Sequence, residues 1–395
     1  MTQSIKSAAP AKPPFWRDPE KRALVFQGLF LVVVGLILYT LVHNTMANLE
    51  RQGIASGFGF LNDSAGFAIK ESLIEFNQSS TFFDSFVVGL LNTIKVSVLG
   101  VFFATILGFT VGVARLSKNW LIARLAAVYV DTLRNVPLLL QMFFWYFAIL
   151  SPLPDPKEAL GWSGLTFLSN RGLYTPKPIF EDGFGFVIAA FFLAIAAIVV
   201  VRIWAKKRQA KTGQQFPVLL TSLGLIIGLP LLAVVATGFP LSWELPVFKG
   251  FNFKGGLVVS PEFASLVFAL SIYTSSFIAE IVRAGIQSVP HGQTEAAFSL
   301  GIKPSWTTRL IILPQSLRVI IPPLTSQYLN LTKNSSLAVA IGYPDLVNVF
   351  AGTALSQVGQ AVEIMGMTLA VYLFLSLVIS SLMNFYNNRK ALIER

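Results

Sequence analysis

Long apolar runs separated by short polar stretches form the main pattern of this chain. A helix needs about 20 mostly apolar residues to cross the hydrocarbon core of a bilayer. Eight segments meet this requirement: 24–43, 85–114, 121–150, 185–203, 217–237, 261–285, 311–334 and 362–386. The pattern therefore predicts an all-α polytopic membrane protein with about eight transmembrane helices. The first run is longer than the apolar region of a signal peptide, so we expect it to be retained.

The charged residues between these runs predict an orientation. If the N-terminus lies in the cytoplasm, the inside segments are 1–23, 115–124, 202–211, 282–309 and 388–395, and they hold 19 of the 30 Lys and Arg residues. The outside segments 45–84, 151–184 and 238–261 hold ten of the 19 acidic residues. Cytoplasmic loops carry an excess of Lys and Arg, so both termini are predicted to be cytoplasmic. We expect 45–84 and 151–184 to contain no folded domain. The second segment is rich in proline, which is typical of a loop.

Composition removes several classes of function. Charged residues make up 12% of the chain, against about 25% in soluble domains, and there is no Cys for a disulfide, a thiolate metal site or a cysteine nucleophile. The net charge of +11 comes from short basic runs between apolar segments, which does not indicate nucleic-acid binding. No G-x-x-x-x-G-K-[ST] motif is present, so no ATP site is expected. His43 and His291 lack ligand-like spacing, and no catalytic residues or metal ligands are predicted.

One predicted cytoplasmic loop, 286–314, has an unusual pattern. It contains "TEAAFSLGIKPSWTTRLIILP", from Thr294 to Pro314. Ser288 to Pro290 predict a helix start, and Glu295 lies near the first turn, where it would favour the helix dipole. Gly301 fits the left-handed position that ends a helix, and Pro304 begins a second one. The loop is predicted to be a helix that lies in a groove of another protein, or else an ordinary interfacial helix with a glycine cap.

The spacing in this loop carries a family resemblance. It reads E-A-A, three residues, G, nine residues, I-x-L-P, and this resembles the signature loop of ABC importer permeases. In that family the loop forms a coupling helix that docks into a cleft of the cytoplasmic ATPase. The resemblance assigns ATPase coupling to Glu295, Ala296, Ala297, Leu300, Gly301, Ile311, Leu313 and Pro314.

Further stretches narrow the resemblance. "GLLNTIKVS" (89–97), "LRNVPLLLQ" (133–141), "YTSSFIAEIVRAGI" (273–286) and "LPQSLRVIIPPLTSQY" (313–328) are similar to the polar amino-acid permeases of the histidine/glutamine/arginine importer type. The five-span core of that family would then occupy 85–150 and 261–395. Residues 1–84 would add a cytoplasmic tail, one span and a periplasmic segment, and 151–260 would insert two spans. This enlarged layout most resembles the Q-type membrane subunit of the general L-amino-acid ABC transporters, whose M-type partner is similar.

The resemblance implies a function as well as a fold. The chain would be a non-enzymatic, multi-pass permease subunit in a bacterial inner membrane, importing amino acids by alternating access. A separate ATPase dimer would bind ATP and Mg²⁺ and act through the 294–314 loop. The other implied partners are a second, non-identical permease, a periplasmic amino-acid-binding protein and the lipid bilayer. Two other classes of protein are considered. A secondary transporter or channel would not need the coupling helix, and a membrane scaffold or signalling subunit would not need the polar helix with its two prolines.

Polar residues within the spans are candidates for a substrate path, because intramembrane polar groups are costly and usually functional. Pro137 is predicted to kink the third span, and Pro322 with Pro323 to break the seventh near mid-depth, so all three are candidate hinges. The substrate-path candidates are Arg134, Gln141, Thr325, Ser326, Gln327, Asn330, Lys333 and Ser335. Snorkelling is the alternative for Arg134 and Lys333, and a kinked helix with satisfied hydroxyls is the alternative for the seventh span.

One charged pair lies near the end of the sixth span. Glu280 and Arg283 stand three residues apart, which predicts an ion pair on the helix surface. Because the pair is close to the predicted cytoplasmic loop, it could also latch that loop to the transmembrane core.

Overall fold

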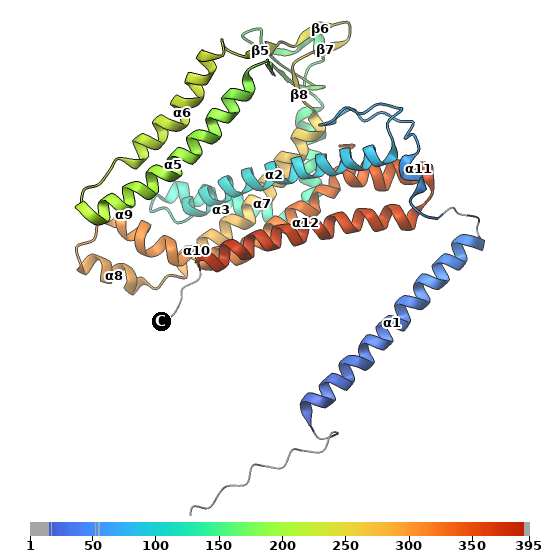
Figure 1. The fold of residues 1–395 in the computed structure, drawn as a ribbon, viewed down its shortest axis with the longest axis horizontal. Coiled ribbons are helices and arrows are strands. Elements are labelled where there is room, and N and C mark those ends of the chain that lie inside the picture. The colour runs from blue at the N-terminus through green and yellow to red at the C-terminus, as the bar shows by residue number, and fades with distance from the viewer. Residues whose placement is uncertain (1–15, 17, 52, 54–55, 391–395) are drawn as a thin grey trace, which may run out of the picture.

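A computed structural model describes residues 16, 18–51, 53 and 56–390 of this chain, which is mostly helical, as predicted (Figure 1). The α-helices are α1 (Pro19–Arg51), α2 (Phe82–Ala114), α3 (Trp120–Asn135), α4 (Leu138–Phe143), α5 (Phe184–Thr212), α6 (Val218–Ala236), α7 (Pro261–Gln287), α8 (His291–Ser299), α9 (Pro304–Thr307), α10 (Leu313–Asn334), α11 (Leu355–Val358) and α12 (Ala361–Lys390). Short 3₁₀ or π segments are η2 (Gly59–Asn62), η3 (Phe144–Leu150), η4 (Pro156–Glu158), η5 (Thr308–Ile312), η6 (Ser335–Ile341) and η7 (Val347–Ala354).

Helices occupy all eight predicted membrane segments, but they are not equally apolar. Among the described residues, α1, α2, α5, α6, α7 and α12 are long and apolar enough to cross a membrane. The pair α3 and α4–η3 would make a seventh span, bent by 106°. The bend falls at Val136 and Pro137, whose backbones are extended, because proline disfavours helical geometry in the residue before it. The predicted kink at Pro137 is thus confirmed, whereas its role as a hinge stays a prediction.

Helices α2 and α7 form the centre of the bundle, and glycines let their backbones approach closely. Gly100, Ala104, Gly108 and Gly112 recur every four residues on the buried side of α2. A Cβ atom at Gly108 would lie 2.6 Å from the Cβ of Ile278, and one at Gly112 would lie 2.7 Å from the carbonyl oxygen of Ala279. Small residues in this spacing are typical of close helix packing in membranes. Helices α3, α4 and α10 pack around α7, which is the most buried of the membrane-spanning helices.

Helix α10 corrects the prediction of a broken seventh span. The helix runs continuously from Leu313 to Asn334 through Pro322 and Pro323. Both prolines are exposed, and other parts of α10 pack on α7 and α12. Proline is tolerated within membrane helices when neighbouring helices hold the segment in place. The same helix is too polar to count among the apolar spans.

The expectation of structureless outer loops is wrong for 151–184. That segment forms β1 (Leu160–Trp162), β2 (Thr166–Ser169), β3 (Gly172–Thr175) and β4 (Lys177–Phe180), and the segment after α6 adds β5 (Leu241–Glu244), β6 (Val247–Lys249), β7 (Asn252–Lys254) and β8 (Leu257–Val259). One antiparallel sheet has the order β1-β2-β3-β8, and β4-β5 and β6-β7 form separate pairs. Strands of three or four residues are too short to show a reliable alternation of polar and apolar positions.

Three helices lie outside the main bundle. Helices α5 and α6 pack mainly on each other and form a hairpin that projects from the strands (Figure 1). Helix α1 lies apart from the other helices, with no buried residue in its most apolar window. They correspond to the segments that the sequence predicts as three extra spans, and their exposed apolar sides are suited to contact with lipid.

Candidate functional site

The helix, glycine stop and second helix predicted for the 286–314 loop are confirmed. Helix α8 ends at Ser299, and Gly301 has a φ of +71°, in the left-handed region. The backbone N–H of Gly301 donates to the carbonyl of Phe298 at 2.9 Å, and that of Ile302 donates to the carbonyl of Ala297 at 3.0 Å. These two hydrogen bonds form a Schellman cap. Helix α9 then begins at Pro304.

The start of α8 differs from the prediction. The helix begins at His291, and Pro290 precedes it as the N-cap residue. Glu295 therefore lies in the second turn, where the helix dipole is weak. Its Oε1 is 2.9 Å from Nδ1 of His291, four residues earlier, and both side chains are exposed. The i, i+4 spacing of His291 and Glu295 is the sequence signal for this pair.

The loop exposes large apolar side chains. Leu300 is 79% exposed, whereas Ala297 is 2% exposed, and α8 packs on α9 and η5. Phe298, Trp306 and Leu310 are exposed as well, and together with Leu300 they form what we call the loop patch. Sequence interpretation identified Leu300 but missed the other three. Their signal was the presence of bulky apolar residues in a segment predicted to be aqueous, where such side chains mark an interaction site.

The second half of the signature connects the loop to α10. Ile311 lies in the π turn η5, and Leu313 and Pro314 form the first turn of α10. The loop thus has α7 on one side and α10 on the other, with no flexible linker between η5 and α10. A displacement of α8 and α9 would act directly on the end of α10.

The predicted ion pair between Glu280 and Arg283 is confirmed, and it belongs to a larger group. The Glu280 carboxylate also accepts from Arg115 at the end of α2, and Arg115 contacts Asp131 of α3 at 3.3 Å. Arg283 donates in addition to Gln287 at 2.6 Å. The group joins α2, α3 and α7 rather than latching α8 to the core.

The structure brings three of the substrate-path candidates onto one side of α10. Ser326, Asn330 and Lys333 are exposed at spacings of four and three residues, and we call them the polar stripe. Pro322 and Pro323 continue the same exposed side. A Lys and an Asn exposed to lipid would be costly, so this side of α10 requires water or another protein.

The other candidates of α10 are used within the chain or are partly covered. The hydroxyl of Thr325 donates to the carbonyl of Ile321 at 3.3 Å, and the buried hydroxyl of Ser335 donates to the backbone carbonyl of Thr332 at 2.7 Å. Gln327 is half-buried. The two hydroxyls satisfy local carbonyl groups, as hydroxyls on membrane helices often do.

Gln141 and Arg134 lie away from the polar stripe, on α4 and α3. The amide nitrogen of Gln141 donates to the carbonyls of Leu133 at 2.9 Å and Val136 at 3.0 Å. It thereby bridges the bend between the two helices and satisfies carbonyls that the break leaves free. The exposed Arg134 places its guanidinium 5.1 Å from the ring centre of Phe277, in cation–π contact.

The segment that follows α10 is held by a buried carboxyl group. Asp345, between η6 and η7, is fully buried and accepts from the backbone N–H of Asn348 at 2.9 Å. The hydroxyl of Tyr372 lies 3.4 Å from its other oxygen. Burial raises the pKa of Asp345 to about 7, because the charged form loses its hydration. The bond to Tyr372 ties Asp345 to α12. The same 342–353 segment packs against α2, where a Cβ atom at Gly89 would lie 2.9 Å from the backbone of Leu346.

Known proteins resemble this chain over nearly all of its length. Residues 212–392 match the protein family described as binding-protein-dependent transport system inner membrane component. The general L-amino acid transport system permease protein AapQ of Rhizobium johnstonii is 54% identical over 378 residues, which cover 96% of this chain and 94% of that protein. The glutamate/glutamine/aspartate/asparagine transport system permease protein BztB of Rhodobacter capsulatus is 41% identical, with 96% of each chain covered.

A solved structure is also similar. It is described as an amino acid ABC transporter with histidines, and it is 21% identical to this chain with a TM-score of 0.45. The match covers 78% of this chain and 95% of the solved one. Among the residues described here, no group of three or more His, Cys, Asp or Glu residues could hold a metal ion.

Proposed function

Because the chain belongs to the family of binding-protein-dependent transport system inner membrane components, we propose that it is the permease subunit of an ATP-driven amino-acid importer. The permease names of AapQ and BztB support the substrate class. The chain would lie in a bacterial inner membrane with both termini in the cytoplasm, in keeping with its charge distribution. ATP and Mg²⁺ would bind to a separate ATPase dimer, and a periplasmic binding protein would deliver the amino acid.

The observation that carries this proposal is the loop patch on a glycine-capped helix at one end of the bundle. Leu300 and Phe298 stand out from the end of α8, as expected of side chains that enter a groove of a partner. Closure of the ATPase dimer would displace α8, and η5 would pass the displacement to α10. The helices would then expose the path alternately to each side of the membrane.

The polar stripe is the part of the chain that we assign to the substrate path. Ser326, Asn330 and Lys333 offer donors and acceptors suited to a zwitterionic solute. Since the stripe is exposed in the single chain, a second, non-identical permease would cover it and complete the path. The two subunits would share the path between them.

The coupling part of the proposal is tested by Leu300→Glu. This change should leave membrane insertion intact, because Leu300 is 79% exposed in the single chain. It should weaken ATPase docking at least about tenfold, since it places a charge where docking would bury an apolar side chain. Co-purification of the ATPase and uptake of tritium-labelled L-amino acids would be measured together. Gln214→Glu, which adds the same charge in the exposed α5–α6 turn, is the matched control. Normal co-purification and uptake by the Leu300 variant would contradict the proposal.

The path assignment is tested by Asn330→Leu. The variant should insert normally, because an apolar side chain suits a membrane helix, but uptake should fall about tenfold if Asn330 forms a hydrogen bond to the solute or to its water. Initial uptake rates over a range of amino-acid concentrations would measure the loss. Asn384→Leu, on an exposed position of α12, is the control and should transport normally. Equal rates in the two variants would remove Asn330 from the path.

A further inference from the structure

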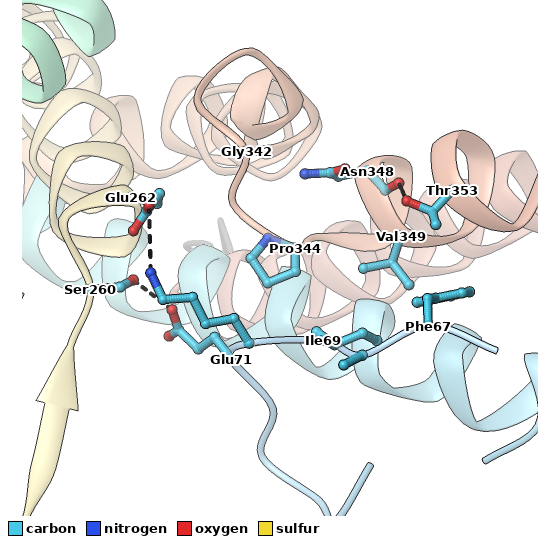
Figure 2. A pocket seen from close by; sticks show the side chains of 12 residues that line it. Phe67, Ile69, Glu71, Ser260, Glu262, Gly342, Pro344, Asn348, Val349 and Thr353 are labelled. Carbon is cyan, nitrogen blue, oxygen red and sulfur yellow. Dashed lines mark hydrogen bonds and ion pairs between the residues drawn. The ribbon is translucent and has the colours of Figure 1, made fainter. Parts of the chain in front are cut away.

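A small polar cavity lies at the end of α7 opposite α8 (Figure 2). Its volume is about 280 Å³. The walls come from three separate parts of the chain: residues 67–71 before α2, the start of α7, and residues 342–353. A cavity of this size is at the lower limit for ligand pockets, so it suits a small metabolite. Neither the loop patch nor the polar stripe contributes to it.

Glu71 fastens one wall of the cavity and is not free to bind a ligand. Its Oε1 accepts from Nζ of Lys95 at 2.7 Å, and its Oε2 accepts from the hydroxyl of Ser260 at 2.6 Å. Lys95 also lies 4.1 Å from the ring centre of Phe263. The Nδ2 of Asn92 donates to the backbone carbonyl of Glu71 at 2.9 Å. These contacts fix the 67–71 segment on α2 and on the start of α7.

Glu262, by contrast, is a carboxylate with weak partners. Its Oε1 accepts from the hydroxyl of Tyr146 at 3.3 Å and lies 4.0 Å from Nζ of Lys70, at the outer limit of an ion pair. Its Oε2 is shielded and has no hydrogen-bond partner among the described residues. Rotation of the carboxylate exchanges the two oxygens, and an ionised carboxylate offers about four acceptor sites. Lys70 is held just as loosely, with 78% of its side chain exposed.

We propose that this cavity is an outer subsite for a zwitterionic α-amino acid, an inference that rests on the proposed transport function. The ammonium group would pair with Glu262 and the carboxylate with Lys70, so that two short ion pairs replace one long one. A purely cationic ligand would be repelled by Lys70, and a purely anionic one by Glu262. Phe67, Ile69 and Val349 give the cavity an apolar side that can receive the amino-acid side chain (Figure 2).

A single cysteine can report on this cavity, because the chain contains no Cys. Ala68→Cys places a thiol in the cavity wall at an exposed position. The complete transporter would be studied in right-side-out membrane vesicles washed free of binding protein, and a membrane-impermeant methanethiosulfonate would modify the thiol. The ligand would be a mixture of the common L-amino acids without cysteine. At ten times the concentration that gives half-protection, modification should slow about tenfold.

Charge variants test which groups hold the ligand. Glu262→Gln should raise the half-protection concentration about tenfold or more, since a charge-assisted hydrogen bond is lost. Glu75→Gln, on the same outer segment and exposed, should leave it unchanged. Amino-acid methyl esters lack the carboxylate and should protect poorly. In Lys70→Gln, the difference between acids and esters should disappear.

The outcomes separate this inference from the proposed function. If the vesicles import labelled amino acids after binding protein is restored, yet no amino acid protects Ala68→Cys, the subsite is refuted and the transport function stands. Protection that is equal in the Glu262→Gln and Glu75→Gln variants would also refute the subsite. Vesicles that show neither import nor protection would refute the transport function and the subsite with it.

Discussion

Replacing Gly301 with proline is expected to reduce amino-acid uptake to the background of cells that lack the gene. Proline holds φ near about −65°, whereas Gly301 has a φ of +71°. The replacement also removes the N–H that donates to the carbonyl of Phe298. The end of α8 would unwind, so Leu300 and Phe298 would no longer present one surface to the ATPase. Uptake of labelled amino acids and the amount of chain in the membrane would both be measured.

Two other residues at this position serve as controls. Gly301→Asn should keep most of the activity, because Asn adopts left-handed backbone more readily than other residues. Gly301→Ala should be intermediate, since the left-handed conformation costs about 1–2 kcal/mol for a residue with a Cβ. All three chains should reach the membrane in similar amounts, because Gly301 has open space around it. Full uptake by the proline variant would show that α8 does not couple the ATPase to the bundle.

A second large effect is expected inside the bundle, for Gly108→Leu. A Cβ atom at Gly108 would lie 2.6 Å from the Cβ of Ile278 and 3.0 Å from the carbonyl oxygen of Ser275. Both atoms belong to the central helix α7, so relief would require α2 and α7 to separate along their contact. Overpacking of this kind costs about 1–3 kcal/mol or more. Most of the chain should then be degraded, or aggregate on extraction into mild detergent.

Size-exclusion chromatography of a fluorescent fusion would measure the loss. Gly228→Leu in α6 is the matched control, because no atom lies within 4 Å of the position where its Cβ would be. That variant should elute as the wild type does, whereas Gly108→Leu should give little folded material. A single sharp peak for the Gly108 variant would mean that α2 and α7 are not held at the distance seen here.

The features that the sequence predicted well are those carried by local patterns. Apolar runs identified the membrane helices, and Pro137 predicted the bend in the third span. The loop was the clearest case, because the spacing of Gly301 from Glu295 and from Pro304 predicted a capped helix followed by a second helix. The same spacing predicted the family, and the near-full-length identity to AapQ confirmed that resemblance.

The features that could not be predicted from the sequence depend on contacts between distant residues. One of the two strands that pair with β3 is β8, which follows two intervening helices, and no local pattern reports such pairing. Which side of α10 stays exposed also depends on tertiary packing. The exposed and the covered path candidates could therefore not be separated from the sequence alone. Glu262 was not recognised because its place in a cavity depends on residues 67–71, nearly 200 positions earlier in the numbering.

The pairing of β4 with β5 and of β3 with β8 has a consequence for how such a chain can change over time. The chain leaves the bundle after η3 and returns to it at α7. The strands on these two segments pair with each other, so the α5–α6 hairpin is connected to the bundle through paired strands. Few residues of its two helices are buried, and they pack mainly on each other. If both helices cross the membrane, they add an even number of crossings, so we expect that the hairpin could be gained, lost or exchanged without changing the orientation of the helices that follow it.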